Sequence, residues 1–469
     1  MTTNKAPFDA LPYATATIDQ LRPEALAGKR VVVWGAGSHG GGLAAARWCA
    51  DAGARVAILD RRPPRELPEA MAEAGIRGWP WHLGESRHPA VRHADLIIVS
   101  PAIPPQALAR LPQDAAPVAC ADALFFAVHT GPRIAVSGTK GKSTTTSMCG
   151  RLLDWPVGGN SHEPLIEVMK RYGTGTPIAC ELSSFQIWHL RPIAPSFTLG
   201  LMTSLHRDHI DWHGSEEHYR ASKLSLLDWC DAVITPPELR QVSGEYADLG
   251  SEIRYQDRRF VCHDGTVIAE RDHLSLPGEH NAVNAALALT AAVHMGLDPA
   301  IAGIRLSQIS PLPHRLEAVH TCGKLHFIDD SIATTPEAAI AGLRSVDQPI
   351  AIILGGADKG ADYASLASMV ASLGAKPVCL GRTAPLIASA LEARGLTPVS
   401  CSNLSDAIHA AVDQLKGAGT VLLSPGCAST DQFADFADRG DQFCALAQEH
   451  WGGRTDDLSA TVERYLDRV

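Results

Sequence analysis

The chain has 469 residues, of which 45% are hydrophobic and 20% are charged, and its formal net charge at pH 7 is −10. This composition excludes a collagen-like or largely disordered chain, and at roughly 100–200 residues per domain the length indicates three domains, with two large ones as the alternative. The acidic balance, without a long basic run, argues against nucleic acid as a partner. No apolar run reaches the roughly 20 residues of a membrane span, and no signal peptide is visible. We expect a cytoplasmic protein with no membrane partner, and a monomer.

The eleven cysteines are scattered and form no CxxC pair. A chain of this length has enough core to fold without disulfides, and thiols in apolar or helical stretches pack as small hydrophobic groups. We expect reduced thiols rather than a disulfide framework.

Short apolar runs alternate with helical stretches along the first part of the chain. Residues 30–35, 55–60 and 94–100 are predicted strands, and residues 40–52 are a predicted helix. Buried strands joined by helices pair in parallel. A proline-rich tract, residues 101–117, follows as a loop or linker.

The same alternation returns twice further along the chain. The middle part has predicted strands at 133–137, 177–180, 197–201 and 232–235, a strand pair within 255–268, and an alanine-rich helix at 281–294. A second linker follows at residues 311–315. The last third has predicted strands at 325–329, 350–354, 378–380 and 421–424, which complete a parallel set, and helices at 336–343 and 363–373. We predict an α/β fold with three domains, residues 1–127, 128–315 and 316–469.

The strongest motif is a glycine-rich turn between a predicted strand and a predicted helix. It reads GTKGKST and consists of Gly138, Thr139, Lys140, Gly141, Lys142, Ser143 and Thr144. Glycines let successive N–H groups face a phosphate, and the helix N-terminus adds its positive dipole. Lys142 would reach the terminal phosphates of ATP, and Ser143 would ligand Mg²⁺. Because the spacing is shorter than GxxxxGK[ST], the strand–loop–helix context distinguishes a phosphate loop from an ordinary glycine-rich turn.

A second glycine-rich turn, GAGSHG at residues 35–40, follows the first predicted strand, and Asp60 ends the next one. This pattern matches the dinucleotide-binding fingerprint, so an oxidoreductase is one alternative. A UDP diphosphate would suit the same helix N-terminus as NAD would. The oxidoreductase alternative leaves the phosphate loop at residues 138–144 unexplained.

Several polar groups follow the phosphate loop. Glu181 comes directly after a strand, where a carboxylate is well placed to hold Mg²⁺, although an acidic helix cap would also fit. His209 lies in HRDHID, which is equally compatible with a solvated polar loop. Lys223 lies on a predicted helix, where lysines are usually solvated. Arg315 lies at the second linker, where an arginine is either solvated or suited to bind a phosphate as domains close.

Ten motifs in order give a resemblance that covers nearly the whole chain. They are GTKGKST, GGN at 158–160, ELSSFQ at 181–186, DHID at 208–211, YRASK at 219–223, GEHNAVNA at 278–285, PHR at 313–315, DDSIATTPEA at 329–338, LGGADKGADY at 354–363 and LLSPGCASTDQF at 422–433. Together they resemble the Mur ligases, and the MurD type most closely. The resemblance implies a Rossmann-like N-terminal domain, a central ATPase domain with a parallel sheet, and a C-terminal Rossmann-like domain.

The resemblance also implies a ligase that uses ATP, two Mg²⁺ ions and CO₂. The residues that would serve the ATP phosphates and the first Mg²⁺ are Lys142, Ser143, Thr144 and Glu181. His209 would ligand the second Mg²⁺. Lys223 would be carbamylated by CO₂, which turns a cation into a carboxylate able to hold that metal. The residues that would also face ATP are Asn281, Asn284 and Arg315.

Further residues would bind the two other substrates that the resemblance implies, UDP-N-acetylmuramoyl-L-alanine and glutamate. Those that correspond to the uracil and diphosphate region are Ser38, His39, Asp60, Arg61 and Ser100. Those that would line the muropeptide are Asn160, Ser183 and Gln186. Those that would surround the amino acid are Asp330, Thr334, Lys359, Ser429, Thr430 and Phe436. ATP would convert the alanyl carboxylate to an acyl phosphate, which the amine of glutamate attacks while domain closure excludes water.

The sequence departs from the MurD pattern at the predicted amino-acid pocket. The family's DSKAT reads DSIAT, with Ile332 in place of the lysine, and Thr430 stands where a leucine usually follows the serine. In addition, GGNIG reads GGNSH, with Ser161 and His162, and the first turn carries Ser38-His39 where hydrophobic or small hydroxyl residues are usual.

Two alternatives concern the substrate. An ordinary MurD-type ligase adds D-glutamate, whereas a variant branch adds L-glutamate; because Ile332 and Thr430 both fall at the acceptor pocket, we favour L-glutamate. Folylpolyglutamate synthases share the phosphate loop and the carbamylated lysine. They leave the N-terminal domain and the LSPxxAS…DQF ending unexplained.

Overall fold

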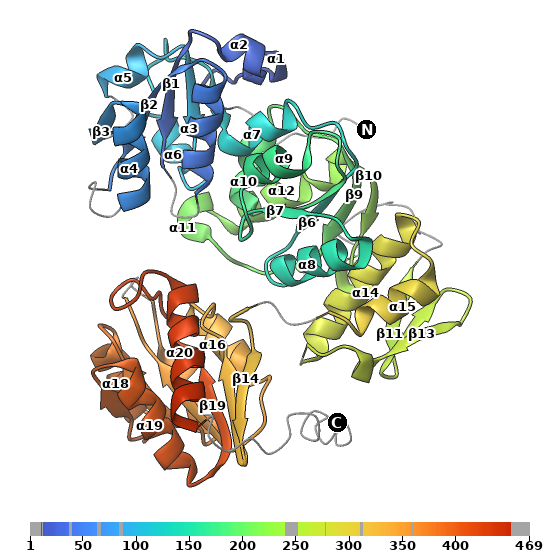
Figure 1. Cartoon of the computed structure of the whole chain (residues 1–469), viewed down its shortest axis with the longest axis vertical. Helices are drawn as coiled ribbons and strands as arrows, with labels where there is room; N and C mark the ends of the chain where they lie inside the picture. The colour runs from blue at the N-terminus through green and yellow to red at the C-terminus, as the bar shows by residue number, and fades with distance from the viewer. Residues whose placement is uncertain are drawn as a thin grey trace. The chain divides into compact units, whose positions relative to one another are not determined.

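The computed structural model describes residues 11, 13–36, 40–62, 67–83, 88–239, 252–276, 278–309, 313–357 and 361–451. Contacts divide the chain into two compact units, one formed by Met1–Glu270 with His280–Leu306 and the other by Arg271–Glu279 with Ser307–Val469. Three sheets belong to the first unit and one to the second (Figure 1).

The N-terminal sheet consists of five parallel strands in the order β3-β2-β1-β4-β5. They are β1 (Arg30–Trp34), β2 (Arg55–Asp60), β3 (Trp81–Leu83), β4 (Leu96–Val99) and β5 (Val118–Cys120). Its helices are α1 (Ile18–Leu21), α2 (Pro23–Leu26), α3 (Gly41–Asp51), α4 (Pro68–Arg77), α5 (Pro89–Arg92), α6 (Pro105–Leu108) and α7 (Ala121–Phe126). The chain leaves β1 toward β2 and later returns to β4 on the other side. This reversal of strand order opens a crevice at the carboxyl ends of β1 and β4.

The second sheet also has five parallel strands, in the order β10-β9-β6-β8-β7. They are β6 (Arg133–Ser137), β7 (Val157–Gly159), β8 (Ile178–Glu181), β9 (Phe197–Met202) and β10 (Cys230–Ile234). The helices between them are α8 (Lys142–Leu153), α9 (Leu165–Tyr172), α10 (Ser184–Leu190), α11 (Ile210–His213) and α12 (Glu216–Leu224), with short 3₁₀ turns at Leu227–Trp229 and Pro237–Leu239. The predicted phosphate loop leaves the central strand β6, at the second reversal of strand order.

The third sheet corrects the sequence prediction of a strand pair. It has three antiparallel strands, β11 (Ile253–Gln256), β12 (Arg259–Cys262) and β13 (Val267–Glu270). The missed turn is Asp257-Arg258, in which both residues have positive φ, 51° and 60°. Such a two-residue turn normally carries glycine or asparagine, so its sequence gave no signal. A 3₁₀ turn at Arg271–His273 precedes α14 (Glu279–His294) and α15 (Pro299–Leu306).

The sheet of the second unit has six strands in the order β14-β15-β19-β16-β17-β18. They are β14 (Glu317–Cys322), β15 (Lys324–Asp329), β16 (Ile350–Leu354), β17 (Lys376–Leu380), β18 (Val399–Cys401) and β19 (Ala418–Leu423). The expected parallel set is corrected at one edge, because β14 is antiparallel to β15. The helices are α16 (Pro336–Leu343), α17 (Ala364–Ser372), α18 (Ala384–Glu392), α19 (Leu404–Leu415) and α20 (Phe436–Trp451).

Alternate residues of β16 determine how this sheet is covered. Ile350, Ile352 and Leu354 pack with α16, α17 and α18, whereas Ala351 and Ile353 pack with α19 and α20. Successive side chains of a strand point to opposite faces, so a continuous apolar run requires helices on both sides. Figure 1 shows α19 and α20 together on one side of this sheet.

These sheets confirm the predicted α/β class with parallel sheets. The three domain boundaries stay a prediction, because one hydrophobic cluster joins residues of the first two sheets, such as Val33 and Ile97 with Ile178 and Cys180. All eleven cysteines are free, as expected, although Cys444 is only half-buried. Among the residues that the structure describes, no helix has both the length and the apolar character needed to span a bilayer.

The second unit encloses a buried cation that the sequence did not reveal. The Arg439 side chain, on α20, is 1% exposed. It donates to Ser331 Oγ (2.9 Å), to the Ser331 carbonyl (2.8 Å) and to the Cys427 carbonyl (3.2 Å). These bonds join α20 to the loops that follow β15 and β19.

We predict that Arg439→Met lowers the free energy of unfolding by roughly 3 kcal/mol or more, because three buried acceptors lose their donor. Urea denaturation measures this change. The control is Arg394→Met, which removes an exposed guanidinium and should change stability by less than about 0.5 kcal/mol. Equal stability of the two variants would contradict the role assigned to Arg439.

Candidate active site

The predicted phosphate loop is pressed against α14. Gly141 has φ +85°, and a Cβ at this position would lie 2.5 Å from Asn284 Oδ1. Only glycine therefore fits between the loop and the helix. Asn284 in turn donates to Asn281 Oδ1 (3.3 Å), so both predicted ATP-facing asparagines lie beside the loop. Ser143 and Thr144 are buried in the first turn of α8.

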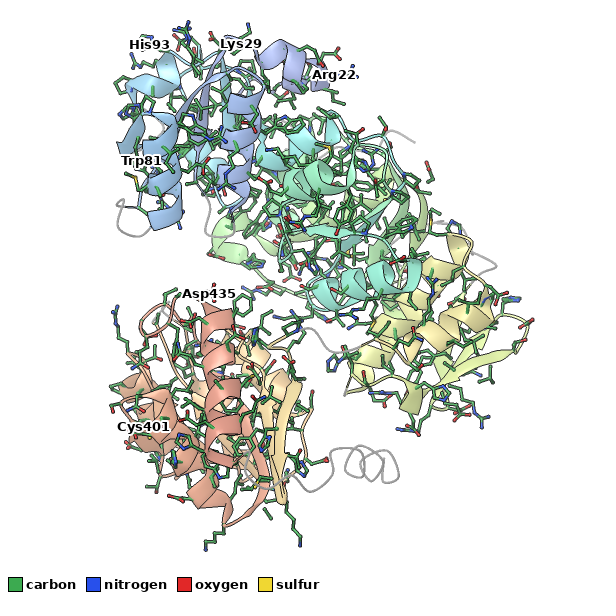
Figure 2. All side chains as sticks on the ribbon, in the orientation of Figure 1. Arg22, Lys29, Trp81, His93, Cys401 and Asp435 are labelled. Carbon is green, nitrogen blue, oxygen red and sulfur yellow. The ribbon has the colours of Figure 1, made fainter. Side chains whose placement is uncertain are left out.

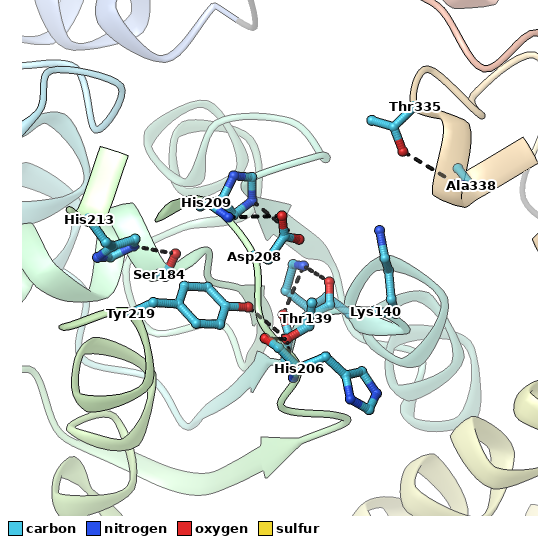
Figure 3. Close-up of polar contacts among 12 residues, drawn as sticks. Thr139, Lys140, Ser184, His206, Asp208, His209, His213, Tyr219, Thr335 and Ala338 are labelled. Atoms are coloured by element: carbon cyan, nitrogen blue, oxygen red, sulfur yellow. Dashed lines mark hydrogen bonds and ion pairs between the residues drawn. The ribbon is translucent and has the colours of Figure 1, made fainter. Parts of the chain in front are cut away.

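The other side of the loop is tied to the segment after β9. Thr139 N donates to the Ser204 carbonyl (2.9 Å), and Lys140 N donates to Ser204 Oγ (2.8 Å). The Tyr219 hydroxyl lies 2.6 Å from Thr139 Oγ1, as Figure 3 shows, and connects α12 to the loop. The Lys140 side chain is exposed.

Two lysine side chains converge on one carbonyl of the loop. Lys142 Nζ donates to the Gly138 carbonyl (2.9 Å), and Lys223 Nζ donates to the same oxygen (2.7 Å). Lys223 is 2% exposed. Burial, and next the charge of Lys142, lower the pKa of Lys223 well below its usual value. The surroundings of Lys223 therefore favour the neutral amine over the ammonium form.

Glu181, at the end of β8, is fully buried. Its Oε1 accepts from Asn160 Nδ2 (2.8 Å) and Ser161 Oγ (3.2 Å). Its Oε2 accepts no hydrogen bond from the described residues and lies 3.3 Å from His162 Nε2. A buried carboxylate oxygen without a donor is a suitable ligand for a divalent cation. The predicted ligand Glu181 therefore fits Mg²⁺.

His209 is the residue directly before α11. Its main chain has φ +51°, which is uncommon for histidine and marks a constrained position. Burial lowers the pKa of His209, and the charges of Lys142 and Lys223 lower it further. Its ring packs edge-on against Phe185, with centroids 4.9 Å apart. Figure 3 shows Asp208 beside this ring.

A cavity of about 730 Å³ opens within the first unit, at the crevice that the strand order predicts. It collects residues from both parallel sheets. The predicted substrate residues in its lining are Asp60, Arg61, Ser100, Asn160, Ser183 and Gln186. Ser38 and His39, also predicted for this region, lie outside the described residues.

Asp60 holds the turn after β1. Its Oδ2 accepts from Ala36 N (2.9 Å), and Arg62 donates to both of its carboxylate oxygens. Burial by itself would raise the pKa of Asp60, but the bonds from Arg62 and Ala36 N hold the pKa below its usual value. Asp60 is therefore a charged anchor of the main chain, and Arg61 and Arg62 are cations that line the cavity.

The cavity also contains a carboxyl group that the sequence reasoning missed. Asp122 lies in the first turn of α7 and accepts from Gln186 Nε2 (3.1 Å). Gln186 Oε1 accepts in turn from Ser183 N (2.9 Å) and Ser183 Oγ (3.0 Å). Burial raises the pKa of Asp122 to about 6. A lone aspartate at a helix start reads as a cap, so only the tertiary contact with Gln186 identifies it.

In the second unit, the predicted amino-acid residues lie in loops at the carboxyl ends of β15 and β19. Asp330 is buried and accepts from Ser424 Oγ (2.6 Å). Burial raises the pKa of Asp330 to about 7, opposed by that bond and by the charge of Arg315. Phe436 begins α20, and its carbonyl accepts from Ser331 Oγ (2.7 Å).

The remaining predicted residues of this unit surround the same loops. Thr334 is half-buried, Ser429 is buried and Thr430 is exposed. Lys359 lies outside the described residues. Arg315, predicted to face ATP, belongs to the second unit and lies close enough to Asp330 to lower its pKa.

Comparison with known proteins supports one family over most of the chain. Residues 136–236 match the Mur ligase middle domain, and residues 314–427 match the Mur ligase glutamate ligase domain. The chain is 33% identical to the UDP-N-acetylmuramoylalanine–D-glutamate ligase of Roseiflexus sp. (strain RS-1), over 90% of this chain and 99% of the relative. It is 32% identical to the enzyme of the same name from Pelotomaculum thermopropionicum, over 88% and 96% of the two chains.

Solved structures support the fold. The UDP-N-acetylmuramate–alanine ligase MurC from Thermotoga maritima superposes with a TM-score of 0.58 at 20% identity, over 90% of this chain and 99% of that chain. MurF from the same organism, in complex with ADP, gives a TM-score of 0.53 at 14% identity, over 96% and 100% of the two chains.

A glycine-rich loop that joins strand β6 to helix α8, a buried carboxylate at the end of the neighbouring strand β8 and the matching domains define an ATP-dependent carboxylate–amine ligase. The chain belongs to the Mur ligase family. This membership confirms the resemblance found in the sequence, and it leaves no role for the oxidoreductase alternative. The individual roles of the site residues stay predictions.

We predict that Asp122→Asn changes how stability depends on pH. The pKa of Asp122 is about 6 in the folded protein against a usual value of 3.8, so between these values the folded state binds more protons than the unfolded state. Its contribution to the free energy of unfolding therefore falls as pH rises. A pKa difference of roughly two corresponds to about 3 kcal/mol. Relative to wild type, Asp122→Asn should gain about this amount between about pH 4 and about pH 7.

Urea denaturation at several pH values measures this difference. Asp114→Asn, which changes an exposed carboxylate, is the matched control and should follow the wild-type curve. If Asp122→Asn also followed the wild-type curve, the raised pKa of Asp122 would be wrong.

Proposed function

We propose that this ligase joins glutamate, preferentially the L-enantiomer, to UDP-N-acetylmuramoyl-L-alanine at the expense of ATP. The observation that carries the proposal is the convergence of Lys142 and Lys223 on the Gly138 carbonyl, next to a phosphate loop and the buried Glu181. The relatives' names supply the substrate class, because they are glutamate ligases that cover nearly the whole chain.

Mg²⁺ is the cation that this site would take. Glu181 and Ser143 would hold one ion, and His209 with a modified Lys223 would hold a second. Mg²⁺ supplies charge neutralisation for the transferring phosphoryl group. Lys142 supplies a further positive charge at the same place, from the first turn of α8.

The carbamate at Lys223 follows from the charge of its surroundings. Because burial and Lys142 lower its pKa, a neutral amine is available to attack CO₂. A nitrogen–carbon bond forms, one proton leaves, and the product is an anion. The neutral amine beside Lys142 thereby becomes a carboxylate, which the positive charge of Lys142 stabilises.

The cavity supports a large anionic substrate. It borders the start of α3 and contains Arg61, Arg62 and Ser100 at one end and Asn160 and Ser183 at the other. A helix N-terminus and arginine side chains suit a diphosphate. The Asn160 end lies against Glu181, so a substrate of this length would extend its carboxylate toward the phosphate loop.

The chemistry then needs an activated carboxylate. The alanyl carboxylate attacks the terminal phosphorus of ATP, the bond to ADP breaks, and an acyl phosphate forms. The amine of glutamate attacks the acyl carbon, phosphate leaves, and the amine loses a proton. Lys142 stabilises the charge on the transferring group, and exclusion of water protects the acyl phosphate.

The preference for L-glutamate rests on the loop after β15. Ser331 is fixed by Arg439, Ile332 N donates to the His314 carbonyl (3.1 Å), and Ala333 N donates to the Asp330 carbonyl (2.9 Å). These hydrogen bonds hold the main chain before and after Ile332. The presence of isoleucine where the family pattern has lysine therefore removes a charge and leaves the backbone in place. The two enantiomers of glutamate place the α-carboxylate differently when the amine points at the same acyl carbon. A pocket that prefers the other enantiomer must therefore have at least one anion-binding group at a different position. Ile332 and Thr430 are where this chain differs from the MurD pattern.

We predict that Lys223→Ala lowers turnover roughly a hundredfold or more, because the second cation loses its anionic ligand. Acetate or formate should restore part of the activity by replacing the carbamate. Phosphate release measures both effects. The control Lys324→Ala removes an exposed lysine and should retain wild-type turnover. Full activity of Lys223→Ala would remove this lysine from the site.

We also predict a preference for L-glutamate in phosphate release with UDP-N-acetylmuramoyl-L-alanine, with Lys142→Ala as the inactive control. Ile332→Lys combined with Thr430→Leu should reduce the ratio of kcat/KM for the two enantiomers by roughly tenfold or more, since a charge-assisted contact is worth about 1.5–3 kcal/mol. Leu386→Lys, which adds a cation at an exposed position of α18, should leave the ratio unchanged. Equal or better turnover with D-glutamate would make the protein an ordinary D-glutamate ligase.

A further inference from the structure

The loop after β7 carries two residues, Ser161 and His162, that depart from the pattern of the family. The loop is fixed against β8. Gly159 has φ +106°, and a Cβ there would lie 2.2 Å from the Glu181 carbonyl, so only glycine permits this approach. Asn160 N donates to that carbonyl (3.1 Å), and His162 N donates to the Gly159 carbonyl (2.8 Å). The imidazole of His162 is thereby held beside the Glu181 carboxylate.

The two oxygens of Glu181 have different surroundings. Oε1 accepts from Asn160 Nδ2 and Ser161 Oγ, which fixes the carboxylate. Oε2 accepts no hydrogen bond from any described residue and lies 3.3 Å from His162 Nε2. The His162 side chain is 13% exposed and lines the substrate cavity. A carboxylate oxygen and an imidazole nitrogen are therefore adjacent at the wall of this cavity.

Their separation fits two ligands of one cation. A charge-assisted N–H···O bond would measure about 2.7–2.9 Å, which is shorter than the observed 3.3 Å. Adjacent ligands at about 2.1–2.2 Å from an octahedral Mg²⁺ or Mn²⁺ ion lie roughly 3.0–3.1 Å apart. The observed separation is within about 0.3 Å of this value.

We propose that His162 Nε2 is a ligand of the divalent cation held by Glu181, and that this nitrogen makes the site favour Mn²⁺ over Mg²⁺. The inference rests on the proposed cation at Glu181 and adds a ligand to it. Mg²⁺ prefers oxygen ligands, such as one or two carboxylates together with phosphates and water. Imidazole nitrogen suits transition metals. Because His162 stands where the family pattern has glycine, we expect this chain to differ from the family in the ion that binds best.

Mn²⁺ is the probe that tests this proposal, because pulsed EPR detects ¹⁴N coupling from an imidazole bound directly to the ion. His209 is itself a predicted ligand, so the measurement uses His209→Asn with Mn²⁺ and ADP. We expect ¹⁴N coupling in that variant and its loss in His162→Asn with His209→Asn. In the single variant His162→Asn, Mn²⁺ should bind at least roughly fivefold more weakly, while Mg²⁺ binding changes less than about twofold.

His263→Asn is the matched control, because His263 is an exposed histidine of the three-stranded sheet and should leave both signals unchanged. His162→Gln is the second variant if His162→Asn fails to fold. Mn²⁺ that binds His209→Asn without ¹⁴N coupling would overturn the proposal and leave His162 as a counter-ion of Glu181. A wild-type protein that binds no Mn²⁺ with ADP would instead overturn the proposed cation site itself.

Discussion

Two lysine side chains donate to one carbonyl oxygen, that of Gly138, and the remainder of the central site depends on this convergence. Two ammonium groups at this separation repel each other, and Lys223 is also cut off from water. The lowered pKa of Lys223 relieves the repulsion in the free protein. The proposed carbamate of Lys223 would relieve the same repulsion, because it would place an anion next to the positive charge of Lys142.

Close backbone approaches hold this arrangement in position. Gly141 lets α14 approach the phosphate loop, and Gly159 lets the loop after β7 approach Glu181. The Tyr219 hydroxyl fixes the register of α12, which carries Lys223 one turn further on. The site is therefore assembled from four segments that are distant in sequence and meet at the carboxyl edge of one parallel sheet.

The second unit also depends on a buried cation, Arg439 of α20. Arg439 is stabilised by one hydroxyl and two carbonyl oxygens. Its bonds fix the loop that carries Asp330 and Ile332. Figure 2 shows Asp435 near the start of the helix that contains Arg439, and Cys401 lies elsewhere in the same unit. The loop after β15 is thus held by α20, a helix that begins only at Phe436.

The sequence by itself determined the features that depend on neighbouring residues. Apolar runs such as Ile350–Leu354 specify a buried strand, and GTKGKST specifies a phosphate-binding turn, because each pattern contains its own physical cause. The order of ten motifs identified the family, which the relatives confirmed. Local signals failed where the chain lacked the usual residue, as at the Asp257-Arg258 turn, which has positive φ without a glycine.

Only the tertiary structure decided the properties that depend on distance and burial. No local pattern marks Asp122 or Arg439, and only packing gave Asp122 its contact with Gln186 and Arg439 its buried acceptors. The contact between His162 and Glu181 joins two strands' ends, and no spacing in the sequence specifies it. A pKa, a cation ligand set and a buried hydrogen bond all depend on which groups fold next to one another, and local sequence patterns do not encode that.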